Sequence, residues 1–387
     1  MKALLKLSNK MLLVCLFSVC PAYAQVRYTV TQLPSFENGT YPRDINASGQ
    51  VVVASYHLGI QDYVTGQNGG APISYYASTL NNSGGLYGVN DKGSVVGWIS
   101  DLSGEDTYQN FAIYTVPNSK EVIEINTNGM DAYGVAINNA GRVAGVMGGH
   151  AFVTDPGGAN AVDLGTLGGV SSVARGINES GQVVGSSSVA NGQTHAFVAS
   201  ADGTGMIDLG TFGGDASDAK AINAKGQVVG YSTLLNGSSH AFVFDEQISE
   251  MVDLGTLGGA ESGANDINIH GQIVGWSKIN GSGVRHAFVT QGDAGGMIDL
   301  NLLADFASSP LGAGVYFTEA FGINDRGQII VKDSWYGAEL LTPIASVPLP
   351  GSIWLFGSVF ILLVNSLSDS PRVRHARREA GIQSQGW

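Results

Sequence analysis

One short pattern recurs seven times along this chain of 387 residues. Each copy pairs an aliphatic residue with asparagine and then continues through a glycine turn into a valine-rich run, as in the GINESGQVVG of residues 176–185. The aliphatic residues of the seven copies are Ile45, Val89, Ile137, Ile177, Ile222, Ile267 and Ile323, which lie 40 to 56 residues apart. An internal period of this length indicates a repeat architecture, whatever number of domains the chain length alone would suggest.

Two further signals recur inside the same unit. HAFV begins at His150, His195, His240 and His286, and DLGT or DLN begins at Asp163, Asp208, Asp253 and Asp299. Each unit therefore contains four short segments that are rich in β-branched and aromatic residues and are bounded by Gly, Asn, Asp or Ser, which is typical of strands. Four strands in a unit of about 40–50 residues predict an all-β fold built from β-propeller blades.

The two ends of the repeat region predict how such a propeller closes. Tyr28–Leu33 stands where other units have DLGTL, and Gly337–Ile344 stands where an eighth HAFV would fall. The N- and C-terminal strands would then pair in one blade, closing a seven-bladed ring without exposed sheet edges. An open β-solenoid is the alternative.

Residues 1–24 have the features of a secretory signal peptide. Three lysines precede an apolar run, and the small-residue sequence AYA ends at Ala24, which predicts cleavage before Gln25. A short membrane anchor and a lipoprotein site at Cys20 are the alternatives. Cys15 and Cys20 both lie in this segment, so a processed chain would have no disulfide.

Residues 346–387 form a second candidate processing signal. Ile353–Leu367 is an apolar run, and it is followed by a basic cluster that includes Arg377 and Arg378. The segment resembles the VPLP type of PEP-CTERM sorting signal through Val347, Pro348, Leu349, Pro350, Trp354, Leu355, Phe356 and Gly357. The resemblance implies an exosortase-type sorting protease as a partner, transient membrane anchoring, and export to the surface of a Gram-negative envelope. The basic cluster sits several residues beyond the apolar run, which departs from the pattern, and a plain C-terminal anchor is the alternative.

The repeat itself is similar to the HAF repeat of extracellular bacterial proteins. Units between about residues 150 and 300 match HAFV, DLGTLGG, GIN and GQVVG in order, while the flanking units match in the IN..G part. The resemblance implies an exported repeat protein spanning residues 25–345 and names no reaction.

The repeated polar residues favour structural roles over a metal centre. A repeating unit spaces its histidines, aspartates and asparagines around a ring and does not gather them on one ion, and short polar side chains in turns usually satisfy backbone donors. We therefore expect no metal and no cofactor, with calcium left open for the acidic loop at Asp101, Glu105 and Asp106. The 32 acidic against 19 basic residues argue against a nucleic-acid partner, and HExxH, GxSxG and a cysteine nucleophile are missing from the sequence.

Three segments interrupt the repeat, at residues 56–76, 98–111 and 302–321. Because strand direction alternates within a blade, all three would emerge on one face, where insertions often mark a binding surface. Their aromatic rings suit the apolar faces of sugars, which predicts ligand-binding residues Tyr63, Tyr75, Tyr76, Trp98, Tyr108, Tyr316 and Phe317. The alternative is that these rings only cover the ends of the blades.

These features together predict a non-enzymatic surface or matrix protein that binds extracellular polysaccharide or another surface protein. The alternatives are a polysaccharide-active lyase or hydrolase on the same scaffold, and a structural surface protein without a specific ligand.

Overall fold

The computed structural model describes residues 26–34, 39–55, 62–74, 84–101, 109–117, 121–200, 202–246, 249–281, 283–292, 295–306 and 311–344. These residues belong to one compact unit, Gln25–Ile344. The predicted signal peptide with its cleavage site at Ala24 and Gln25, and the predicted sorting signal at 346–387, lie outside them. Within these ranges no helix has both the length and the apolar character needed to cross a bilayer.

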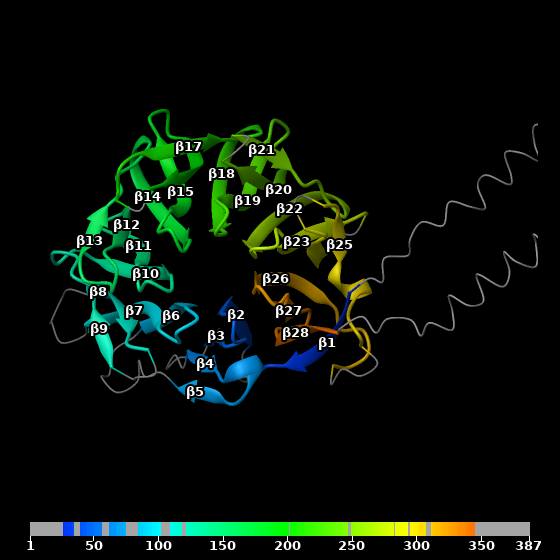
Figure 1. Cartoon of the computed structure of the whole chain (residues 1–387). Coiled ribbons are helices and arrows are strands. Elements are labelled where there is room, and N and C mark those ends of the chain that lie inside the picture. Colours follow the sequence, from blue (N-terminus) through cyan, green and yellow to red (C-terminus); the bar gives the residue numbers. More distant parts are fainter. Residues whose placement is uncertain are drawn as a thin grey trace, which may run out of the picture. The chain divides into compact units, whose positions relative to one another are not determined.

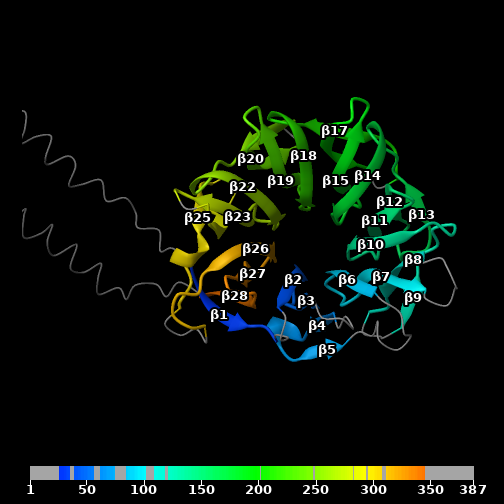
Figure 2. The ribbon, with the colours of Figure 1, turned by 180° about the vertical axis from the view of Figure 1, so that it is seen from behind.

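The predicted all-β fold is confirmed for this unit. Apart from the short 3-10 turns η1 (Gln67–Gly69) and η3 (Leu300–Leu302), the regular elements of the described ranges are strands. Most of the strands belong to four-stranded antiparallel sheets in which consecutive strands pair. The figures show these sheets arranged around a central space, seen from the front in Figure 1 and from behind in Figure 2.

Three of these sheets come from the first part of the unit. They consist of β2 (Thr40–Ile45), β3 (Val51–Ser55), β4 (Tyr63–Thr65) and β5 (Pro72–Ser74); β6 (Gly84–Val89), β7 (Val95–Asp101), β8 (Gln109–Thr115) and β9 (Val122–Glu124); and β10 (Ala132–Ile137), β11 (Val143–Met147), β12 (His150–Thr154) and β13 (Ala161–Asp163).

The next strands build an eight-stranded sheet whose two halves meet at a single parallel pair, Thr194 and Ala216. The halves are β14 (Gly168–Ile177), β15 (Val183–Val189), β16 (Thr194–Ala199) and β17 (Met206–Gly210), and β18 (Gly213–Ile222), β19 (Gln227–Leu234), β20 (Ser239–Asp245) and β21 (Glu250–Asp253). They are followed by the sheet of β22 (Gly258–Ile267), β23 (Ile273–Ile279), β24 (Arg285–Thr290) and β25 (Met297–Asp299).

The last sheet combines strands from both ends of the unit. It consists of β26 (Phe317–Ile323), β27 (Ile329–Asp333), β28 (Ala338–Ile344) and β1 (Arg27–Gln32). Strand β1 pairs antiparallel with β28 over six residue pairs, from Arg27 opposite Ile344 to Gln32 opposite Glu339. Figure 1 shows β1, in blue, beside β28.

The hydrophobic core is divided into clusters that lie between consecutive sheets. The phenylalanine of each HAFV segment is fully buried in these clusters, at Phe152, Phe197, Phe242 and Phe288. Removing such a ring typically costs about 3–5 kcal/mol. One cluster joins the first and last sheets, because Ile45 and Val53 pack with Ile330 and Leu340.

Seven strands, β2, β6, β10, β14, β18, β22 and β26, each contain a β-bulge three residues before the repeated asparagine. A bulge leaves one residue unpaired and redirects its side chain. The close approach of the neighbouring strand explains the last glycine of GQVVG. A Cβ atom on Gly185, for example, would lie 1.9 Å from the carbonyl oxygen of Val173.

The repeated asparagines link each sheet to the next. Each is 3–5% exposed, and its Nδ2 donates a hydrogen bond of 2.9–3.3 Å to the backbone carbonyl of the asparagine in the following sheet. The series runs Asn46, Asn90, Asn138, Asn178, Asn223, Asn268, Asn324 and back to Asn46. The side-chain oxygen caps the turn of its own repeat, as Asn138 does by accepting the N–H groups of Ala140 and Arg142.

Candidate functional site

The predicted aromatic binding residues that the structure describes do not form one surface. Tyr63 and Phe317 are buried at 3% and 0% exposure, so these two predictions of surface contacts are wrong. The Tyr63 hydroxyl donates to the backbone carbonyl of Pro34, and burial raises the pKa of Tyr63. Phe317 packs in the cluster between the last two sheets and stacks on Phe306 at 5.1 Å.

The other predicted aromatics are placed separately. Trp98 is half-buried on β7, and Tyr316 is half-buried beside His286, with ring centroids 5.3 Å apart. These two residues belong to sheets that are separated by the β2–β5 sheet. Tyr75, Tyr76 and Tyr108 lie outside the described residues.

A different pair of aromatic residues is exposed, on the turn between β27 and β28. Trp335 is 71% exposed and Tyr336 is 61% exposed. The Oδ1 atom of Asp333 accepts the N–H groups of Trp335 and Gly337, both at 2.7 Å, and this holds the turn. Tyr336 has a φ of 69°, which is unusual for a bulky side chain and persists only where the surroundings enforce it. Trp335 and Tyr336 are called the aromatic turn below.

Lys332 lies between the ring of Tyr336, in the aromatic turn, and the ring of Tyr41. Lys332 Nζ lies 3.8 Å from the ring centroid of Tyr41 and 4.9 Å from that of Tyr336. Cation–π contacts of this kind contribute about 0.5–1 kcal/mol at exposed sites. Tyr41 also lines the central cavity, so the exposed aromatic turn and the cavity are linked through Lys332.

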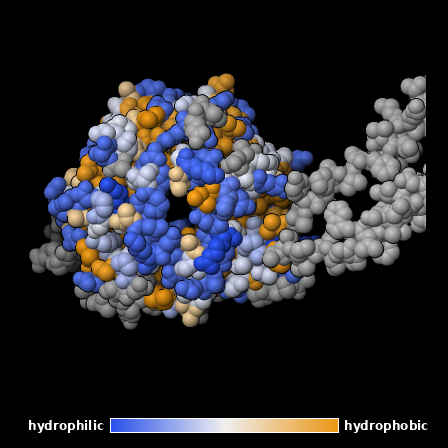
Figure 3. Space-filling model, viewed as in Figure 1, coloured by the Kyte–Doolittle hydropathy of each residue, from blue (hydrophilic) through white to orange (hydrophobic). Residues whose placement is uncertain are grey.

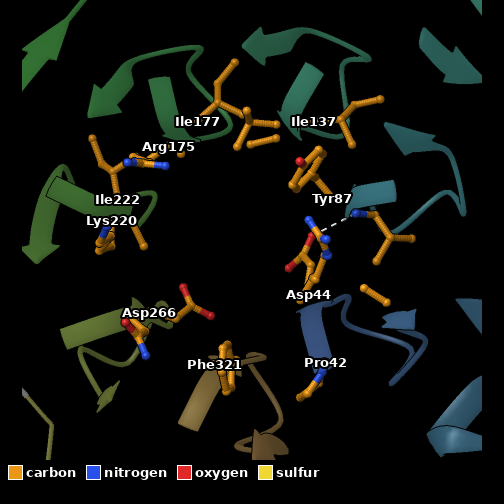
Figure 4. Close-up of a pocket in the computed structure, with 18 of the residues that line it drawn as sticks. Pro42, Asp44, Tyr87, Ile137, Arg175, Ile177, Lys220, Ile222, Asp266 and Phe321 are labelled. Carbon is orange, nitrogen blue, oxygen red and sulfur yellow. Dashed lines mark hydrogen bonds between the residues drawn. The ribbon is translucent and has the colours of Figure 1, made fainter. Parts of the chain in front are cut away.

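The cavity has a volume of about 560 Å³ and lies at the centre of the sheets. All seven first strands, β2, β6, β10, β14, β18, β22 and β26, contribute residues to it. Figure 4 shows labelled side chains from separate strands directed into this common space, and Figure 3 shows hydrophilic residues around a hollow at the centre of one face. The volume is within the usual range for ligand pockets, about 300–1,000 Å³.

Every bulge residue lines this cavity. The seven residues skipped by the strand registers are Arg43, Tyr87, Val135, Arg175, Lys220, Asn265 and Phe321. None of them is fully buried. The bulge therefore turns one side chain of each repeat towards the axis.

Three of the bulge residues are cations. The Arg43 guanidinium lies 4.2 Å from the ring centroid of Tyr87. Lys220 Nζ donates to Asp218 Oδ2 at 2.7 Å, and Arg175 lies 3.5 Å from the same oxygen. Lys220 and Arg175 therefore share the carboxylate of Asp218. These cations line the cavity of a chain whose net charge is −13.

Two aspartates line the cavity next to the bulge positions. Asp44 accepts the N–H groups of Ile45 and Val89, and Asp266 accepts those of Ile267 and Ile323. In each case one oxygen holds its own strand and the other holds the next sheet. Burial raises the pKa of Asp44 to about 6 and that of Asp266 to about 7, although the backbone donors act in the opposite direction.

The repeated histidines and aspartates pair with each other within sheets, a contact that the sequence analysis did not predict. Nδ1 of each HAFV histidine lies 2.6–3.2 Å from the carboxylate of the aspartate thirteen residues later. In the three DLGT copies the aspartate also accepts the N–H of the glycine two residues on, as at Gly210. Within the ranges that the structure describes, three or more His, Cys, Asp or Glu side chains do not gather in any place that could hold a metal ion.

Aligning the seven repeats would have revealed part of this site. The residue three positions before the repeated asparagine changes in nearly every copy, while the aliphatic residue and the asparagine recur. The aromatic turn carries no repeat signal, because its residues stand out only through their exposure in the folded sheet.

Comparisons with known proteins bear on the fold alone. No family model matches the chain, and no curated protein matches it in sequence. Among solved structures, YCF48 bound to the D1 peptide is 13% identical with a TM-score of 0.50, and the match covers 83% of this chain and 98% of that one. An ancestral GH74 enzyme is 12% identical with a TM-score of 0.51 over 83% of this chain and 52% of its own.

The extracellular domain of a one-component system from B. thetaiotaomicron is 8% identical, with a TM-score of 0.51, over 81% of this chain and 39% of that chain. The chain thus spans about half or less of the last two proteins. At such identities the likeness extends to the fold, and this chain is similar to β-propeller proteins.

Proposed function

We propose that residues 25–344 form a closed, seven-bladed β-propeller that is exported and acts as a non-enzymatic binding module at the cell surface or in the extracellular matrix. The hydrogen-bonded series of seven asparagines supports the number of blades and the closure, because Asn324 returns to Asn46. Pairing of β1 with β28 supports it independently. Export, by a signal peptide and a PEP-CTERM signal handled by an exosortase-type protease, rests on the sequence resemblance.

The ligand of this module is a polysaccharide, and its contact surface is the aromatic turn. The observation that carries this proposal is the exposure of Trp335 and Tyr336 on a turn that is fixed by Asp333. Flat, exposed aromatic rings suit the apolar faces of sugar rings, and a fixed turn loses little conformational entropy on binding. This surface takes the place of the aromatic set predicted from the sequence, because two members of that set are buried.

The alternative, a polysaccharide lyase or hydrolase, draws on Asp44 and Asp266. Carboxyl groups with raised pKa values in a cavity are candidates for acid–base chemistry. Here both oxygens of each carboxylate already accept backbone N–H groups that hold strands together. That engagement favours a structural role for the two aspartates, and binding without chemistry for the protein.

The test measures retention of the full chain on the host's exopolysaccharide, together with release of reducing or unsaturated ends. We expect retention without new ends, and loss of retention in Trp335→Ala. The matched control is Trp276→Ala, because Trp276 is covered by the Arg285 guanidinium at 3.7 Å and lies on another sheet. Equal retention of Trp335→Ala and the wild type would reject the aromatic turn as the contact, and new chain ends would favour the enzyme.

A further inference from the structure

The repeats differ at the position where they face the cavity. The aliphatic residue and the asparagine that follow the bulge serve the scaffold and recur in all seven repeats. The bulge residue itself makes no strand pair and projects towards the axis, so the fold does not dictate its chemistry. Each sheet region can therefore present a different side chain to the cavity without disturbing the repeat, which suits a ligand site.

Three cations and two aspartates line the cavity, and the aspartates, Asp44 and Asp266, are engaged by backbone N–H groups. The cations are Arg43, Arg175 and Lys220, and the second and third of these share Asp218. Within the described part of the chain no carboxylate lies in ion-pair distance of Arg43, whose guanidinium stacks on Tyr87. A stacked guanidinium with its edge donors unused is suited to bind a carboxylate in a bidentate manner.

The cations stand on different sides of the cavity. Arg43 belongs to β2, whereas Arg175 belongs to β14 and Lys220 to β18, and two sheets separate β2 from β14 in chain order. Between the cations lie aromatic and amide side chains, including Phe321 and Asn265. This arrangement fits a compact molecule that has carboxylates at its ends and both apolar faces and hydroxyl groups between them.

We propose that the axial cavity is a binding site, separate from the aromatic turn, for a short acidic saccharide whose carboxylates contact Arg43 and Arg175. Tyr87 and Phe321 would pack against the sugar rings, and Asn265 and Lys220 would hydrogen-bond hydroxyl groups. The site takes uronic-acid sugars and discriminates against neutral sugars of the same size, because a neutral sugar offers the guanidinium groups no carboxylate with which to form charge-assisted hydrogen bonds.

The test uses isothermal titration calorimetry of the full chain with digalacturonate, and with the corresponding neutral digalactoside as the comparison ligand. We expect binding of digalacturonate only. Arg43→Gln and Arg175→Gln should each weaken it by about tenfold or more, as expected for the loss of one charge-assisted contact. Arg43 is a suitable position because it packs on Tyr87 and its replacement should disturb the fold little. An unchanged thermal melting temperature would show that the variant is folded.

The matched control is Arg285→Gln, which removes the same charge from a residue that stacks on Trp276 and does not line the cavity. Digalacturonate affinity should be unchanged in this variant, and also in Trp335→Ala, which separates this site from the polysaccharide surface. Equal affinity for the acidic and the neutral disaccharide, no binding of either, or equal weakening by Arg285→Gln and Arg43→Gln would each overturn the proposal.

Discussion

The side-chain Nδ2 of Asn324 donates a 3.0 Å hydrogen bond to the backbone carbonyl of Asn46, 278 residues earlier in the chain. The same atom also contacts Gln328 Oε1 at 2.9 Å, and Asn324 Oδ1 accepts the backbone N–H groups of Arg326 and Gln328. One amide therefore caps its own turn and ties the last sheet to the first. The amide supplies both the donor and the acceptor that this double role requires, and asparagine occupies all seven positions.

Asn324→Asp should therefore destabilise the protein. Aspartate keeps the acceptor but loses the donor, and it places a charge at a site that is 5% exposed. We expect the free energy of unfolding to fall by about 2–4 kcal/mol, measured by urea denaturation. The control is Asn236→Asp, where the exposed side chain acts as an acceptor for the Ser238 N–H and an aspartate can do the same. Equal stability of the two variants would contradict the role of the asparagine series.

Gly185→Ala should be strongly destabilising, because the new Cβ atom would meet the Val173 carbonyl oxygen at 1.9 Å. The backbone of the bulged strand would have to move, at a cost of about 3 kcal/mol or more. Gly296→Ala is the matched control, since a Cβ atom there meets no described atom within 4 Å and its φ is not in the left-handed region. Thermal melts of both variants test the contrast, and a Gly185→Ala protein as stable as the control would contradict it.

Glu339 predicts an unusual dependence of stability on pH. It is fully buried beside Asp333, and burial, followed by the charge of Asp333, raises its pKa to about 9 from the usual 4.5. The oxygens of Glu339 find no donor among the described residues. The carboxyl pair formed by Glu339 and Asp333 can therefore make a hydrogen bond only if it holds a proton. Between pH 4.5 and 9 the folded protein keeps a proton that the unfolded chain releases. The free energy of unfolding should therefore fall with rising pH, by up to about 1.4 kcal/mol per pH unit.

Glu339→Gln should flatten this dependence, because a neutral amide carries no titrating proton. Urea unfolding midpoints at pH 5, 6, 7 and 8 measure the pH dependence of stability. The control is Glu250→Gln, at an exposed position, which should keep the wild-type dependence of stability on pH. A Glu339→Gln protein with the wild-type slope would show that the carboxyl pair is not the source.

The affinity of the cavity for digalacturonate should decrease as the pH rises from 5 to 8. Asp44 and Asp266, with pKa values of about 6 and 7, gain negative charge over this range and oppose the field of Arg43, Arg175 and Lys220. Asp218 pairs with two of these cations, and Asp91 and Asp325 add charge near the two titrating groups. We expect the binding free energy to weaken by about 1 kcal/mol over this pH range, which corresponds to an approximately fivefold decrease in affinity.

Asp266→Asn should remove much of this pH dependence. Asp215→Asn is the control, because Asp215 is bonded to Gln193 and does not line the cavity. Calorimetric titrations at four pH values compare the variants, and the same pH dependence in Asp266→Asn and the wild type would exclude Asp266 as the titrating group.

The all-β fold and the strand positions were predictable from the sequence because they depend on local chemistry. Short β-branched runs such as QVVG, and turn residues such as Asn178 and Gly181, act within one unit of the chain. A structural role for the repeated histidines and aspartates was expected, but the pairing of His195 with Asp208 became apparent only in the folded sheet.

The site was predicted less well, because exposure is a property of the packed sheets. Tyr63 and Phe317 looked like surface aromatics in the sequence, yet both are in the core, and Trp335 was overlooked although it is the most exposed aromatic residue described. The insertions that suggested a binding face are only partly described, so Tyr75, Tyr76 and Tyr108 remain predictions.

The sequence by itself determined the repeat, its strands and turns, and the chemistry available at each position, since these follow from the intrinsic preferences of short segments. Only the tertiary structure decided that the bulge residue of each repeat faces the axis. That outcome depends on strand register, and a shift of one residue exchanges the two faces of a strand. Arg43 and Arg175 meet in one cavity because the sheets surround it, although 132 residues separate them in the chain.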